Sequence, residues 1–111
     1  MNAYTIEKTM LERVGQHEKN AFGECLNIYG NYVWNAVKQF TSSEIEAETA
    51  TAEIFNEIWN YSNRFNPSDS SENKFITLIT YHYLSIRFGK NKVLKYDNNS
   101  TGRKELDKSF V

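Results

Sequence analysis

Apolar residues recur every three or four positions along most of this chain, which is the spacing of one face of an α-helix. The longest repeat lies within residues 18–40 and consists of Phe22, Leu26, Tyr29, Val33, Ala36, Val37 and Phe40. A single proline and five glycines leave long stretches without a helix breaker, which favours helices over strands and turns. The sequence therefore predicts an all-α fold.

Two helices are expected in the first 40 residues. Thr5 is expected to cap a short helix that ends near Val14, and Gly15-Gln16-His17 separates this helix from a second one over residues 18–40. The single cysteine, Cys25, lies within the second helix. It excludes an intramolecular disulfide, fits a reducing compartment, and is expected to be a small buried hydrophobic residue.

Two more helices are expected after residue 42. The third spans residues 43–64, where Ser43 and Glu46 have the spacing of a capping box. The fourth spans residues 73–88 and is closed by Gly89, in the position that glycine favours after a helix. The predicted fold is a compact bundle of about four helices.

One domain is expected, because 111 residues support a single modest core and 40% of them are apolar. This domain is predicted to span residues 1–90. Residues 91–111 form a polar tail, expected to be flexible, or the start of an interdomain linker. The chain is then either a piece of a longer protein or a single-domain protein.

Charge is divided unevenly along the chain. Residues 1–74 contain six Lys or Arg and eleven Asp or Glu, whereas residues 75–111 contain seven and three, so the net charges are −5 and +4. This asymmetry predicts two charged surfaces with different partners. The alternative is a solvated acidic helix followed by a basic tail.

No enzyme, cofactor or metal site is expected. The two histidines, His17 and His82, lie far apart in the sequence and Cys25 is alone, so they predict no metal cluster. Phosphate-binding glycine motifs and the nucleophile elbow are absent from the sequence. No apolar run approaches the roughly 18 residues that span a bilayer, and the N-terminus lacks the pattern of a signal peptide. The expectation is a cytoplasmic protein without membrane insertion.

The third and fourth helices are expected to have distinct faces. On the third helix the outward positions form an acidic stripe: Glu46, Ala50, Glu53, Glu57 and Asn60. Its inward positions are Thr51, Phe55, Ile58 and Trp59. On the fourth helix the inward positions are Phe75, Leu78, Ile79, His82 and Ile86, which makes His82 a buried, hydrogen-bonded histidine. The outward positions are Thr77, Thr80, Tyr81, Leu84, Arg87 and Phe88.

Two sets of residues occur in a fixed order within residues 46–67. The first set is Ala47, Glu48, Glu53, Phe55, Trp59, Arg64, Phe65 and Pro67, and the second is Glu46, Ile54, Ile58 and Asn66. This order resembles the central helix of the sigma-70 family, specifically region 2 of the extracytoplasmic-function sigma factors of bacterial RNA polymerase: the first set is identical to the family pattern, and the second set consists of close replacements. Further matches extend the resemblance to roughly residues 9–90: Leu11–Val14, Ala21, Phe22, Leu26, Tyr29, Val33, Ala36 and Phe75–Ile79.

The resemblance implies a transcription initiation factor domain with two partners. The third helix would bind the β′ clamp of the RNA polymerase core, through Glu46, Thr49, Glu53, Asn56 and Glu57. The following loop and the fourth helix would melt the promoter −10 element and read its non-template strand. The residues implied in DNA binding are Asn66, Ser70, Asn73, Lys74, Tyr81, Arg87, Phe88, Lys90 and Lys92.

Several positions depart from the family pattern. Thr49 and Ala52 replace a hydrogen-bonding Asp and Gln, and Tyr81, Leu84 and Ser85 stand where an R-x-x-R-N run is common. These departures keep a second interpretation open: a degenerate sigma-like regulator that binds RNA polymerase or an anti-sigma factor without reading promoter DNA. A third is a helical bundle unrelated to transcription.

Overall fold

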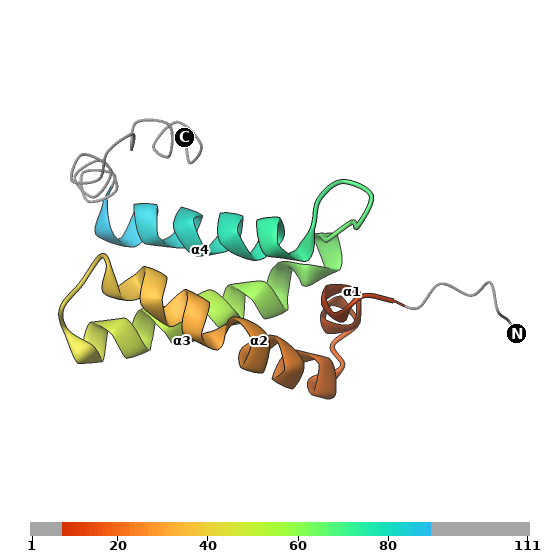
Figure 1. Cartoon of the computed structure of the whole chain (residues 1–111), viewed down its shortest axis with the longest axis horizontal. Coiled ribbons are helices and arrows are strands. Elements are labelled where there is room, and N and C mark those ends of the chain that lie inside the picture. The colour runs from red at the N-terminus through yellow and green to blue at the C-terminus, as the bar shows by residue number, and fades with distance from the viewer. Residues whose placement is uncertain (1–7, 90–111) are drawn as a thin grey trace, which may run out of the picture.

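Residues 8–89, which the computed structural model describes, form only helices and their connections. The elements are α1 (Met10–Gly15), α2 (Lys19–Lys38), α3 (Glu44–Tyr61), the 3₁₀ helix η1 (Ser62–Arg64) and α4 (Glu72–Phe88). In Figure 1, α2 and α3 run in opposite directions, α4 lies along them, and α1 crosses one end of the bundle. The predicted all-α, four-helix fold is confirmed. The predicted tail at residues 91–111 lies outside the described residues.

The first helix is shorter than predicted. It begins at Met10, and residues 8 and 9 are not helical, so the expected continuous helix from Thr5 is wrong; Thr5 itself lies outside the described residues. Thr9 is the true cap. Its hydroxyl accepts the Glu12 N–H at 3.2 Å, and the Glu12 carboxylate accepts the Thr9 N–H at 2.8 Å. This reciprocal pair satisfies two N–H groups that the helix itself leaves without acceptors.

Only half of the capping box predicted at the start of α3 forms. The Ser43 hydroxyl accepts the Glu46 N–H at 3.1 Å, as expected. The Glu46 carboxylate, however, accepts the Thr41 hydroxyl at 2.6 Å, and the Ser43 N–H donates to that hydroxyl oxygen at 3.1 Å. The Thr41 hydroxyl therefore accepts the Ser43 N–H, which the Glu46 carboxylate was expected to accept.

The core is built from one stripe of each helix. Its fully buried large or medium side chains include Leu11, Val14, Cys25, Val33, Val37, Ile54, Ile58, Ile76 and Leu84. Cys25 is buried as predicted, and burial, with a smaller contribution from the charge of Glu72, raises the pKa of its thiol to about 12. Leu26, predicted to face the core, is instead 42% exposed because Cys25 takes the inward position.

Aromatic rings join α2 to α3. Phe22 contacts Phe55 and Trp59 edge to face, with ring centroids 6.4 and 5.1 Å apart. His17, in the turn before α2, stacks on Trp59 at 4.5 Å and has a φ of 62°. Since a non-glycine residue seldom adopts this left-handed conformation, the stacked ring helps to offset its cost.

The rotation of α4 differs from the prediction. Its buried residues are Ile76, Thr80 and Leu84, two of which were expected to face outward. Leu78 and Ile86 are 49% and 71% exposed, and His82 is also exposed, although all three were predicted to face inward. The predicted outward positions Thr77, Tyr81 and Phe88 are half-buried.

Polar groups of α1 and α2, one of them a backbone N–H, hold α4 at this rotation. The Tyr29 hydroxyl donates to the Asn73 side-chain oxygen, and the Tyr32 hydroxyl lies 3.0 Å from the Thr77 hydroxyl. The carboxylate of Glu72 accepts the Leu11 N–H at 2.8 Å. These bonds hold the first turns of α4 against α1 and α2. As a result, the residues from Ile76 to Leu84 that share one side of α4 face the core.

Gly15 allows α1 to approach η1 closely. A Cβ atom at this position would lie 2.8 Å from the Asn63 Cα and 2.8 Å from the Ser62 carbonyl oxygen. Both neighbours are backbone atoms, which cannot turn away as a side chain could. A Cβ at Gly30, in the middle of α2, would meet nothing within 4 Å.

Two glycine replacements should therefore have opposite effects on stability. Gly15→Ala is expected to lower the free energy of unfolding by about 1–3 kcal/mol, because the methyl group forces α1 and η1 apart. Gly30→Ala, the matched control, should raise it by about 0.5–1 kcal/mol through helix propensity. Urea denaturation followed by circular dichroism measures both, and a stabilising Gly15→Ala would contradict the close contact.

Candidate functional site

The five residues implied in polymerase binding share one side of α3. Glu46, Thr49, Glu53 and Asn56 are exposed, and Glu57 is half-buried at the edge nearest α4. At 100° per residue they fall within roughly a third of the helix circumference. We call this set the outer face of α3. Ala50 was predicted to belong to this side, but it is fully buried, because the helix turns it toward the core between Ala47 and Ile54.

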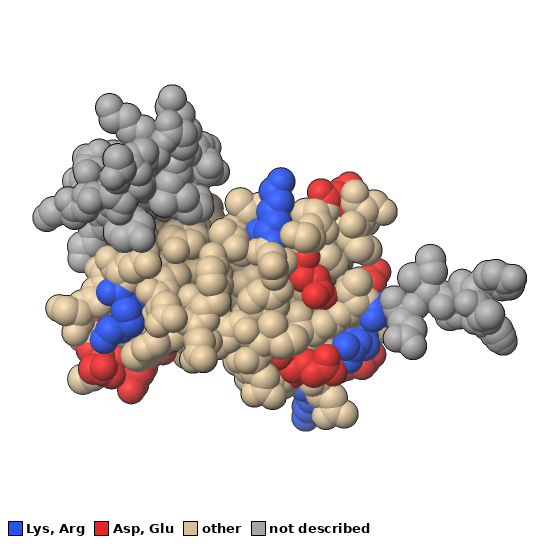
Figure 2. Space-filling view, in the orientation of Figure 1, with Lys and Arg blue, Asp and Glu red and all other residues tan. Residues whose placement is uncertain are grey.

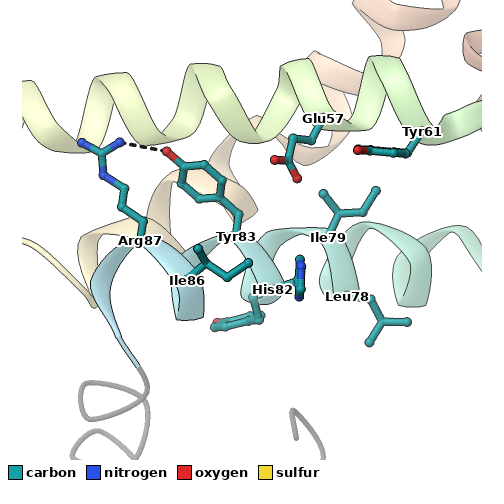
Figure 3. Close-up of a pocket in the computed structure, with 9 residues that line it drawn as sticks. Glu57, Tyr61, Leu78, Ile79, His82, Tyr83, Ile86 and Arg87 are labelled. Carbon is teal, nitrogen blue, oxygen red and sulfur yellow. Dashed lines mark hydrogen bonds between the residues drawn. The ribbon is translucent and has the colours of Figure 1, made fainter.

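Glu53 is held by two residues of α4. Its carboxylate accepts the Tyr83 hydroxyl and lies 3.2 Å from Nη1 of Arg87. The same Arg87 nitrogen donates to the Tyr83 hydroxyl oxygen at 2.9 Å (Figure 3). Glu53 and Arg87 were assigned to two different partners by the sequence, yet they contact each other. Tyr83 bridges them and was not singled out at all.

Glu53, Tyr83 and Arg87 form a cluster that we call the trio, and their contacts shift the pKa values of Tyr83 and Arg87. Partial burial, followed by the hydrogen bond to Glu53, raises the pKa of Tyr83 above its ordinary value. The hydrogen bond with Tyr83 raises the pKa of Arg87, with a further contribution from Glu53. Arg87 therefore remains charged and directed at α3, where its Nη1 is used by Glu53 and Tyr83.

Several residues implied in DNA binding make contacts within the bundle. Asn73 accepts the hydroxyl of Tyr29, and Tyr81 and Phe88 pack against Phe40 with ring centroids 6.1 Å away. These two rings are thus part of the bundle, where free stacking platforms were expected. Lys74 is exposed near the start of α4. Lys90 and Lys92 lie outside the described residues.

The loop before α4 keeps its own internal structure. The Asn66 side chain accepts the Ser68 N–H at 2.9 Å, and its backbone carbonyl accepts the N–H groups of Asp69 and Ser70. Ser71 then caps α4 by accepting the Lys74 N–H at 3.1 Å.

A hollow of about 350 Å³ lies beside this loop. The residues that line it include Tyr29, Phe65, Pro67, Ser70 and Asn73. The hollow thus places two aromatic rings next to polar loop side chains.

A larger groove of about 560 Å³ runs between α3 and α4. Figure 3 shows Glu57 and Tyr61 of α3 on one wall and Leu78, Ile79, His82 and Ile86 of α4 on the other, with Tyr83 and Arg87 at one end. Among residues 8–89, Glu57 makes no hydrogen bond or ion pair. We call this feature the α3–α4 groove. The sequence did not predict it, because it depends on the rotation of α4.

A second groove, of about 480 Å³, lies between α2 and α3 and is lined mainly by Phe22, Leu26, Phe55 and Trp59. Charged side chains in Figure 2 gather near the α2–α3 turn and around α1, and the middle of that face is largely uncharged. The aromatic and aliphatic lining makes the α2–α3 groove more apolar than solvation requires.

Comparisons with protein-family models, with curated proteins and with solved structures give no match for this chain. Within residues 8–89, no three His, Cys, Asp or Glu side chains converge where they could hold a metal ion. None of the helices in that range is both long and apolar enough to cross a bilayer.

Replacing the bridging tyrosine tests the link between α3 and α4. Tyr83→Phe keeps the ring and removes the hydroxyl, so the free energy of unfolding should fall by about 1 kcal/mol. The pKa of Tyr83 is raised in the folded protein. The contribution of its hydroxyl to the free energy of unfolding is therefore complete below the ordinary tyrosine pKa of about 10, and it is lost as pH rises through the raised value.

The measurement is urea denaturation at neutral and at alkaline pH. Tyr83→Phe should show a weaker alkaline loss of stability than the wild type. Tyr61→Phe, which removes an exposed hydroxyl that makes no described hydrogen bond, is the matched control and should change neither value. Equal behaviour of the two variants would show that the trio contributes nothing to stability.

Proposed function

We propose that this chain is a sigma-like protein-binding module that docks the outer face of α3 on a partner, and that the partner is the β′ clamp of RNA polymerase. One observation carries the proposal: all five positions that the sequence resemblance implies for the clamp lie on one side of one helix, and four of them are exposed. An arbitrary set of five positions over twelve residues would be divided between the core and solvent.

The charge of this face supports a partner with basic groups. Glu46 and Glu57 have no cationic partner among the described residues, and the ion pair between Glu53 and Arg87 is open to solvent. Neighbouring carboxylates on one helix repel each other by a few tenths of a kcal/mol, and a basic surface relieves that repulsion. Complementary charge would also raise the association rate.

The intramolecular contacts favour protein binding over promoter reading. Asn73, Tyr81, Arg87 and Phe88 already have partners within the bundle. Moving each of them to DNA would cost the contacts that it makes now. This supports the degenerate sigma-like regulator over the complete initiation factor.

Promoter binding stays a second candidate because of the hollow beside the loop. Reading of single strands uses aromatic rings and polar groups that receive unstacked bases. The hollow offers Tyr29 and Phe65 beside Ser70 and Asn73, and its volume is of the order needed for a base. Lys74 nearby could contact phosphate.

Polymerase binding is tested by a charge at the centre of the outer face. Asn56→Lys adds a positive charge where the partner is expected to be basic, and no described hydrogen bond is lost. We expect its affinity for RNA polymerase core to fall about tenfold, a cost of about 1.4 kcal/mol. Glu48→Gln, exposed on α3 but outside the outer face, changes the net charge by the same single unit; it is the matched control and should stay within about twofold of the wild type.

The measurement is a titration of labelled chain with purified core enzyme at moderate salt, with circular dichroism as the check on folding. Absence of wild-type binding would refute the proposal. So would an equal loss of affinity in both variants, since that would reflect net charge and not a defined contact.

The second candidate predicts that a bulky residue in the hollow blocks single-stranded DNA. Ser70→Tyr fills the space, and loss of one stacked base should weaken binding by about 1–3 kcal/mol. Ser68→Tyr, at an exposed position of the same loop, is the control. Fluorescence anisotropy with a labelled −10-like single strand measures both, and no binding by the wild type would eliminate this candidate.

A further inference from the structure

The α3–α4 groove exposes an apolar stripe that the fold does not use. Leu78, His82 and Ile86 are four residues apart and so form one line along α4, about 12 Å long at 1.5 Å per residue. Leu78 is 49% exposed, Ile86 is 71% exposed, and Tyr61 on the opposite wall is 45% exposed. Large side chains gathered in this way around a groove mark a contact surface.

The charge within the groove restricts what can cover it. Glu57 projects from α3 between Tyr83 and Tyr61 and faces α4 (Figure 3). Arg87, the cation that lines the same groove, forms an ion pair with Glu53 and a hydrogen bond with Tyr83. A purely apolar occupant would strip water from the Glu57 carboxylate and give it no partner, which is costly. An occupant that fits must bring a cation to that point.

The walls of the groove also restrict the occupant's backbone. They are the side chains of two helices whose N–H and C=O groups are satisfied within the helices, so an extended peptide would find few backbone partners there. A helix satisfies its own backbone groups and presents apolar residues at positions i, i+3, i+4 and i+7, the usual anchors of a helix bound in a groove.

We propose that the α3–α4 groove binds an amphipathic helix of a partner protein, with a Lys or Arg of that helix facing Glu57 and apolar residues on either side of it seated against Leu78 and Ile86. This binding is independent of the polymerase proposal, because it uses the groove and not the outward-pointing positions Thr49 and Asn56. The two proposals share only Glu57.

The test uses the full 111-residue chain and synthetic helical peptides of about 18 residues, long enough to form a helix. One peptide carries Leu at positions i and i+7 with Arg at i+4, and its matched partner carries Glu in place of that Arg. Nuclear magnetic resonance titration of backbone amides gives both the location and the affinity. The Arg peptide is expected to saturate and to shift the amides of Leu78, His82 and Ile86.

The decisive comparison changes the charge at Glu57 and measures how the affinities for the Arg and Glu peptides respond. Glu57→Gln should weaken binding of the Arg peptide about five- to tenfold, and Glu57→Arg should reverse the preference so that the Glu peptide binds better. Glu48→Gln, on α3 outside the groove, should change nothing. Asn56→Lys should also leave peptide binding unchanged, so a failed polymerase test and a failed groove test can be told apart.

Three results would overturn the inference. Equal binding of the Arg and Glu peptides would show that Glu57 takes no part. Amide shifts confined to Leu26 and Trp59 would assign the peptide to the α2–α3 groove. Sedimentation of the free chain as a dimer that Ile86→Asp dissociates would show that a second copy of the chain occupies the groove.

Discussion

Hydrogen bonds from three tyrosines hold α4 at its observed rotation about the helix axis. Tyr29 and Tyr32 of α2 bind the first turns of α4, while Tyr83 near its end binds Glu53 of α3. The rings of Tyr29 and Tyr83 pack against the core while their hydroxyls form hydrogen bonds, which suits an amphipathic side chain. Ile76, Thr80 and Leu84 then fill the core between these anchors, and the exposed stripe and the groove follow from the same rotation.

Sequence periodicity predicted α2 and α3 well because their polar and apolar residues separate clearly. In α3 the carboxylates and Asn56 lie opposite Ile54, Phe55 and Ile58, so the outer face could be predicted, with Ala50 the one error, since alanine is small enough for either side. The predicted cap Ser43 is confirmed, whereas Ser71, which caps α4, was not predicted.

The rotation of α4 could not be predicted in the same way. Apolar side chains occur all around this helix, so two opposite faces have similar hydrophobicity, and the buried one contains Thr80, whose hydroxyl has no hydrogen-bond partner in the described part of the chain. The choice between the faces depends on bonds to residues more than forty positions away, such as Tyr29 with Asn73. A pattern confined to one helix carries no information about such partners. The errors in the predicted burial of His82 and Leu84 both follow from this one choice.

The exposure of the candidate residues was correspondingly easier to predict on α3 than on α4. Predicting the outer face requires only the rotation of α3, whereas predicting the α3–α4 groove requires the rotations of both helices. Tyr83 illustrates the difference. It has no motif or unusual spacing, and only its bonds to Glu53 and Arg87 show that it joins the two surfaces.

The bond between the Leu11 N–H and the Glu72 carboxylate has a mechanical consequence. A six-residue helix has no stability of its own, so α1 persists only while its neighbours hold it. Glu72 sits where the loop meets α4, and any ligand that pulls this junction away leaves the buried Leu11 amide without an acceptor. Opening of the loop therefore removes one of the contacts that hold α1. A change at residues 66–72 would reach a helix about sixty positions earlier in the sequence, as faster amide hydrogen exchange in Leu11 and its neighbours.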